Sequence, residues 1–110
     1  VAAELEWLVM PGGEESFHES DPADAVYVLL AGSLGAFRGE GAEMRLVGRI
    51  HPGETVGEMA LLSGHPRSAT VRTLRDSELV RFSLRAFEAL AQAHPQATLA
   101  IARTAVARLE

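Results

Sequence analysis

Short apolar segments, each ended by glycine or proline, fill the first two-thirds of the chain. They are rich in β-branched and aromatic residues, and they recur at intervals of about 8–12 residues. The segments expected to form strands are 5–9, 16–18, 25–31, 34–38, 44–50, 69–73 and 78–82. Because each segment is long enough for only one strand and a turn follows at once, the pattern predicts a small β-sandwich or barrel.

A helical period replaces this pattern in the last quarter of the chain. Ser83 is the expected N-cap of a helix over 84–93, and Pro95 suits the first position of a second helix. The apolar stripe of that second helix is Leu99, Ala102, Val106 and Leu109. We expect this stripe either to pack back on the strands or to pair with a second copy of the chain, and the sequence leaves both open.

Length and composition exclude several classes of protein. The 110 residues suit a single domain over 1–110, with strands at about 5–83 and helices at about 84–109. Fifteen acidic and ten basic side chains give a net charge of −5, which argues against direct nucleic-acid binding. The chain has no cysteine for disulfides or thiolate metal sites, and its four histidines lack metal-ligand spacing. No apolar stretch approaches the ~20 residues that a membrane span needs.

Catalytic patterns are also missing from the sequence. Without lysine the chain cannot form a P-loop, and it contains no pattern of nucleophile and base. We therefore expect a domain that is not an enzyme and that has neither a metal nor a cofactor. The chain starts at Val1 and ends inside a helical pattern, so we expect it to be a piece of a longer protein.

The segment 56–71, with the sequence VGEMALLSGHPRSATV, suits a ligand that carries both a phosphate and sugar hydroxyls. A guanidinium such as that of Arg67 offers paired donors that match phosphate oxygens. Ser68 adds a hydroxyl and a backbone N–H, and Ala69 is small enough to let a ligand approach the main chain. The simpler alternative for Arg67 is a surface arginine in a β-turn.

The start of the same segment has its own two interpretations. Glu58 could interact only with the dipole of a short helix, in whose first turn it would stand. Alternatively, Gly57 lets the backbone approach a ligand because it has no Cβ. The N–H groups of Met59 and Ala60 would then point at the anion from the first helical turn.

In its order of residues the segment resembles the phosphate-binding cassette of the cyclic nucleotide-binding domain family. That family includes bacterial catabolite-activator regulators, protein kinase A regulatory subunits and cyclic-nucleotide-gated channels. Gly32 and the pair Pro52-Gly53 fit as well, and the resemblance covers roughly 5–110. It implies that Arg67 pairs with the exocyclic phosphate oxygens and that Glu58 accepts a hydrogen bond from the ribose 2′-OH.

The resemblance also implies a fold and a function. The fold would be mainly β: an eight-stranded double-stranded β-helix, or jelly-roll-like β-roll, with a short cassette helix and two C-terminal helices. The domain would bind a 3′,5′-cyclic nucleotide in the cytoplasm, or on the cytoplasmic side of a membrane-associated parent protein. It would signal occupancy through its C-terminal helices to an output domain of the same chain. Threonine at the position of Ser68 is associated with cGMP, whereas serine and alanine occur in cAMP binders, so cAMP is expected over cGMP.

Three questions stay open at this level. Val47 could lie against the purine or be plain core. The domain could instead keep the fold without the ligand, as an interaction or dimerisation module. Residues 76–82, with Phe87 and Pro95, resemble the modules of neuropathy target esterase and patatin-like phospholipases, which would make the parent a lipid hydrolase. A transcription regulator is the other parent considered.

Overall fold

The computed structural model describes residues 5–57, 60 and 64–96, and eight strands lie within these ranges. They form two antiparallel four-stranded sheets, with the orders β1-β8-β3-β6 and β2-β7-β4-β5. The strands are β1 (Leu5–Met10), β2 (Glu15–Phe17), β3 (Ala25–Ala31), β4 (Leu34–Arg38), β5 (Arg45–Ile50), β6 (Thr55–Val56), β7 (Thr70–Thr73) and β8 (Ser77–Ser83). A short 3-10 turn, η2 (Gly41–Glu43), and one helix, α2 (Leu84–Ala93), complete the described elements.

The predicted mainly-β, jelly-roll-like architecture is confirmed, and each of the seven expected segments overlaps an observed strand. The pattern missed β6, because two residues after a Pro-Gly turn are too few to show an alternation. Ala60 is helical, and the N–H of Gly64 donates to its carbonyl over 3.0 Å. The rest of the predicted cassette helix, in 58–63, lies outside the described residues.

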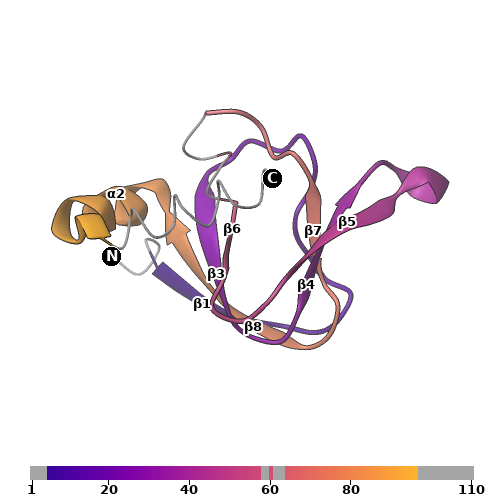
Figure 1. The fold of residues 1–110 in the computed structure, drawn as a ribbon, viewed down its shortest axis with the longest axis horizontal. Coiled ribbons are helices and arrows are strands. Elements are labelled where there is room, and N and C mark those ends of the chain that lie inside the picture. The colour runs from indigo at the N-terminus through magenta and orange to yellow at the C-terminus, as the bar shows by residue number, and fades with distance from the viewer. Residues whose placement is uncertain (1–4, 58–59, 61–63, 97–110) are drawn as a thin grey trace.

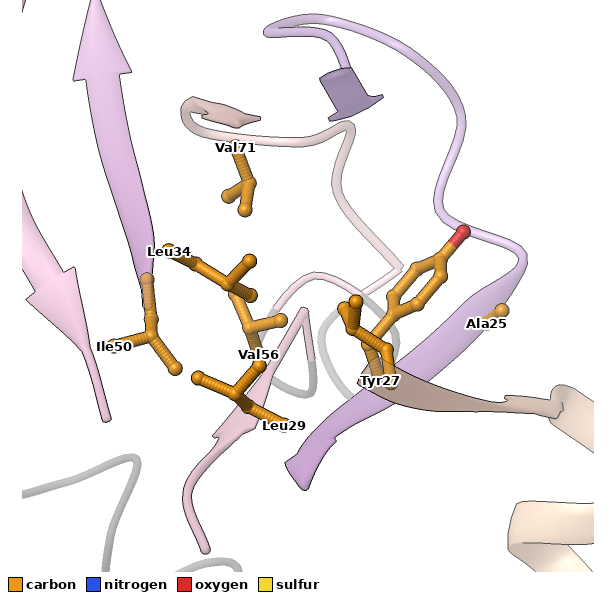
Figure 2. Packing of buried hydrophobic residues seen from close by; sticks show 8 residues of the cluster. Ala25, Tyr27, Leu29, Leu34, Ile50, Val56 and Val71 are labelled. Atoms are coloured by element: carbon orange, nitrogen blue, oxygen red, sulfur yellow. The ribbon is translucent and has the colours of Figure 1, made fainter. Parts of the chain in front are cut away.

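Side chains from both sheets meet in one core between them (Figure 2). Three leucines, Leu29, Leu34 and Leu79, are completely buried there. The whole cluster comprises Ala25, Tyr27, Leu29, Leu34, Ile50, Val56, Val71 and Leu79. Burying one such side chain is worth about 1.5–3 kcal/mol relative to leaving it exposed. The core therefore holds the two sheets together and fixes which face of each strand points inward.

Helix α2 packs on β3 and β8, beyond the first sheet and on the side away from the second (Figure 1). Phe87 of α2 and Val26 of β3 are both buried, although neither belongs to the main core cluster. The predicted bounds and cap of α2 are confirmed, since the Ser83 hydroxyl accepts from the N–H of Ala86 over 3.1 Å. Pro95 is helical as expected, and the remainder of the second helix lies outside the described residues.

Candidate anion-binding site

Arg67 lies in the loop just before β7 and is only 2% exposed. Two backbone hydrogen bonds hold this position against the loop that follows β2. The N–H of Arg67 donates to the carbonyl of Asp21, and the N–H of Ser20 donates to the carbonyl of Arg67, both over 2.8 Å. The alternative of a surface arginine in a turn is therefore wrong, because the loop buries the side chain.

The guanidinium of Arg67 is bonded to two backbone carbonyls. Nη2 donates to Ala25 at the start of β3 over 2.7 Å, and Nη1 donates to Gly57 over 3.1 Å. Nε is buried and finds no acceptor in the part of the chain that the structure describes. Burial lowers the pKa of Arg67, but a guanidinium starts so high that it stays charged at working pH. The site thus presents a buried positive charge with one nitrogen, Nε, that has no hydrogen-bond acceptor among the described residues.

Gly57 allows this arrangement at the start of the cassette. Its φ of +91° is a conformation that side chains disfavour, and a Cβ there would collide with Nη1 of Arg67. The sequence predicted that the backbone at Gly57 would come close to a ligand. In the structure this backbone lies close to the guanidinium of Arg67.

Aromatic rings and one carboxylate surround the guanidinium. Its carbon lies 4.1 Å from the ring centroid of Phe17, which in turn lies 5.7 Å from the ring of Tyr27. The carboxylate of Asp24 reaches two arginines: Oδ1 is 3.7 Å from Nη2 of Arg67, and Oδ2 is 3.3 Å from Nη2 of Arg81. None of these three neighbours was a candidate from sequence, where Phe17 and Tyr27 stood only in expected strands and no local pattern linked Asp24 to position 67.

The other predicted site residues divide into three groups. Ser68 is exposed and Ala69 half-buried, directly beside Arg67, and the carbonyl of Ser68 accepts from Nε of Arg38 over 3.2 Å. Ala60 is half-buried in its helical turn. Glu58 and Met59 lie outside the described residues.

Val47 lies apart from these residues in the topology, on β5 at the edge of the second sheet. The strand shifts register there against β4, between Ala36 and Phe37. Val47 is 45% exposed, so the alternative that made it plain core is wrong. Next to it Gly48 faces open space, since a Cβ there would meet nothing within 4 Å. Room for a bulky group therefore exists beside Val47.

A comparison against known families identifies the domain as a whole. The family model of the cyclic nucleotide-binding domain matches residues 8–94. The chain belongs to the cyclic nucleotide-binding domain family. A cyclic nucleotide-binding domain is a regulatory module, so the expectation that this domain is not an enzyme is confirmed.

Curated relatives of this cyclic nucleotide-binding domain include fungal lysophospholipases. The protein named Lysophospholipase nte1 from Aspergillus terreus is 35% identical over 106 residues, and NTE1 from Chaetomium globosum is 37% identical over 107. Each match covers 96% of this chain but 7% of the relative. The predicted likeness to modules of neuropathy target esterase-like proteins is confirmed, and the chain spans only a small part of the relatives it matches.

Solved structures share the fold of this cyclic nucleotide-binding domain. The catabolite activator protein of Thermus thermophilus superposes with a TM-score of 0.85 at 28% identity, over 97% of this chain and 51% of that one. The regulatory domain of Toxoplasma gondii PKA, crystallised with cAMP, gives 0.73 at 27% identity, over 78% and 33%. The first is a catabolite activator and the second is a kinase regulatory domain, and these are two of the groups that the sequence resembles.

The described ranges 5–57, 60 and 64–96 contain no helix that is long and apolar enough to cross a bilayer. They also contain no cluster of three or more histidine, aspartate or glutamate side chains that could hold a metal ion.

Proposed function

We propose that this domain binds a 3′,5′-cyclic nucleotide and that Arg67 holds the phosphate. The observation that carries the proposal is the buried guanidinium with an unpaired Nε. A buried donor without an acceptor costs free energy, and a buried charge is normally neutralised by a partner. An anionic phosphate supplies both the acceptor and the opposite charge.

The remaining contacts would come from the rest of the cassette. Ser68 is exposed beside Arg67, so its hydroxyl and N–H are accessible to a second phosphate oxygen. Glu58 would accept from the ribose 2′-OH, while Met59, Ala60 and Ala69 would supply backbone or close contacts. Val47, half-exposed next to the open space at Gly48, would lie against the base. We favour cAMP over cGMP because Ser68 takes the place of the threonine associated with cGMP.

Occupancy would reach the helices through Asp24. This carboxylate lies between Arg67 and Arg81, and Arg81 belongs to β8, which leads directly into α2. A phosphate on Arg67 would compete with Asp24 for the guanidinium and leave Asp24 to Arg81. The ligand would thereby favour one arrangement of β8 and α2, which is the condition for transmitting a signal.

Isothermal titration with cAMP and, separately, with cGMP tests the proposal. The wild-type domain should bind at micromolar concentration or tighter, with the lower dissociation constant for cAMP. Arg67→Ala should weaken binding at least 30-fold, the effect of about 2 kcal/mol, because a buried charged contact is lost. Arg67→Lys keeps the charge without the paired donors, which checks that an effect does not come from unfolding. Arg85→Ala, on the exposed side of α2, is the control that should bind like wild type.

A different observation favours an interaction module as the second candidate. Leu5, Trp7 and Val9 stand side by side on the outer face of the edge strand β1 and are 54%, 67% and 74% exposed. Such a row suits a protein contact. Failure of a folded wild-type domain to bind either nucleotide, with self-association in ultracentrifugation that Trp7→Ser abolishes, would favour this function. A dimer formed through the predicted stripe in 99–109 would instead survive that substitution.

For the longer protein we propose a lipid hydrolase in the cytoplasm, or on the cytoplasmic face of a membrane, that this domain regulates. The names of the fungal relatives support the choice, and the 7% coverage leaves ample length for an output domain. The test is lysophospholipase activity of the full-length protein with and without cAMP, in wild type and in Arg67→Ala. A change on adding cAMP that disappears in the variant is expected. A hydrolase indifferent to cAMP would contradict the proposed regulation.

A further inference from the structure

The guanidinium carbon of Arg67 lies over the ring of Phe17, which comes from the neighbouring strand. Phe17 ends β2, and β2 pairs with β7, the strand that begins three residues after Arg67. The ring centroid lies 4.1 Å from the guanidinium carbon, within the range of a cation–π contact. The register of the sheet therefore brings together two residues that are 50 positions apart.

The carbonyls and the ring constrain different motions of the guanidinium. All five N–H donors of a guanidinium lie in its plane. The bonds from Nη2 to Ala25 and from Nη1 to Gly57 therefore limit rotation within that plane. They control its tilt less well, and an aromatic ring whose centroid lies 4.1 Å from the guanidinium carbon restricts that motion. With both kinds of contact present, the direction of the unpaired Nε–H is defined.

The burial of Arg67 makes its interaction with the Phe17 ring more favourable than the same interaction would be at an exposed site. Arg67 is 2% exposed, so water cannot stabilise its charge. The nearby carboxylate of Asp24 is 71% exposed and 3.7 Å away, so solvent screens it. The ring of Phe17 lies 4.1 Å from the guanidinium carbon and is itself partly buried against the core, so it can stabilise the cation with less screening by solvent.

We infer that Phe17 is a positioning residue of the anion site, whose ring holds the Arg67 guanidinium so that its Nε–H keeps one direction, in which a phosphate entering the site would bind. The inference rests on the proposed function in naming the phosphate as the anion. Phe17 does not itself contact that anion and acts through Arg67. Its side chain also packs against the main core, so the ring face has to be separated from the apolar volume in any test.

Three substitutions separate these two roles. Phe17→Tyr keeps the ring face, whereas Phe17→Leu and Phe17→Met keep apolar volume and remove the ring. Phe37→Leu is the matched control, because the ring of Phe37 lies 5.9 Å from the guanidinium carbon of a different arginine, Arg72. If Phe17→Leu fails to fold, the flexible methionine fills the space and decides the question. Thermal unfolding of each variant reports the cost to the core.

The first measurement is the affinity for cAMP by isothermal titration, at a temperature where every variant is folded. Phe17→Leu and Phe17→Met should weaken binding about 5- to 30-fold, the range of a desolvated cation–π contact. Phe17→Tyr should restore affinity to within about threefold of wild type, and Phe37→Leu should leave it unchanged. Equal affinity for cAMP in all four variants would overturn the inference. An equal loss of affinity in Phe17→Met and Phe17→Tyr would overturn it as well.

The second measurement needs no ligand, so failure of the proposed function remains distinguishable. The ring current of Phe17 should displace the Nε–H resonance of Arg67 in the nitrogen-15 NMR spectrum, and Arg67→Lys assigns that resonance. The displacement should persist in Phe17→Tyr and disappear in Phe17→Met. If wild type binds no cyclic nucleotide, the proposed function fails, while this signature still decides whether Phe17 positions Arg67. A resonance unmoved in Phe17→Met would overturn the inference.

Discussion

Nη2 of Arg67 donates a hydrogen bond to the carbonyl of Ala25, over 2.7 Å and across 42 positions of sequence. This bond attaches the end of the cassette to the first residue of β3, the strand that supplies three of the core side chains. The anion site is therefore supported by the core of the domain. A substitution of Gly57, whose carbonyl also accepts from this guanidinium, should therefore disturb the site and the fold together.

Gly57→Ala should weaken both folding and binding. The new Cβ would collide with Nη1 of Arg67 and would also sit at a φ of +91°. We expect the free energy of unfolding to fall by about 1–3 kcal/mol in urea denaturation, and the affinity for cAMP to fall at least tenfold. Gly53→Ala isolates the backbone cost, because Gly53 has the same φ but no atom within 4 Å of its Cβ position. Equal behaviour of the two variants would refute a role for the collision.

Gly32→Ala should destabilise the domain without a comparable loss of affinity for cAMP. At a φ of +103°, a Cβ would meet the Ser77 hydroxyl and would lie 2.7 Å from the carbonyl of Asp76. Strain and collision together should lower the free energy of unfolding by about 2–4 kcal/mol, measured with urea. Gly13→Ala, with a φ of +88° and open space around its Cβ position, should cost less. A smaller loss for Gly32→Ala than for this control would rule out the proposed collision.

Ser83→Ala should lower stability through the start of α2. The hydroxyl of Ser83 caps the N–H of Ala86, and loss of such a cap costs about 0.5–2 kcal/mol. Urea denaturation measures the loss, and Ser83→Asp should recover most of it because aspartate is an equally good cap. No recovery by Ser83→Asp would show that the hydroxyl acts through something other than the cap.

His18 lies between two carboxylates, with Nδ1 2.7 Å from Glu15 and Nε2 2.8 Å from Glu40. Only the imidazolium carries a proton on both nitrogens, so the hydrogen bonds to Glu40 and then to Glu15 raise the pKa of His18 above 6.5. Two other charged groups face this cluster. Asp21 accepts from the backbone N–H of His18, and Arg72 lies 3.8 Å from the second oxygen of Glu15.

The stability that His18 contributes should depend on pH in one direction. Because its pKa is raised on folding, the contribution is fully present below pH 6.5, the value of the unfolded chain, and is lost as the pH rises through the folded pKa. Urea denaturation from about pH 5.5 to 8.5 should show the difference between wild type and His18→Gln shrinking as pH rises. Glu40→Gln should reduce that dependence. A difference that stays constant over this range would contradict the assignment.

Much of the fold follows from local pattern. The bounds of β3, β4 and α2 agree with those expected from the sequence, because alternation, turn residues and the cap at Ser83 act within a few positions. The sequence pattern did not predict β6, because this strand has only two residues and depends on its pairing with β3. Local pattern also identified Arg67 and Gly57, which share one short segment of characteristic order.

The surroundings of Arg67 could not be predicted in the same way. Phe17 lies at the end of β2, and Asp24 lies in the loop before β3. No sequence pattern around either residue indicates that it contacts Arg67. Sheet register brings them together. For the same reason the sequence left open whether the arginine was exposed in a turn or buried.

The amino-acid pattern was sufficient to establish every described strand except β6, the first C-terminal helix and the family to which the cassette belongs, because those signals are short-range. It could not establish which face of β1 points inward. Alternation makes Leu5, Trp7 and Val9 one face, yet this face is exposed, while Leu8 and Met10 pack against the core. Pairing with β8 and closure of the sheet over the common core decide that choice, as they decide the burial of Arg67. Both depend on contacts between residues far apart in the chain.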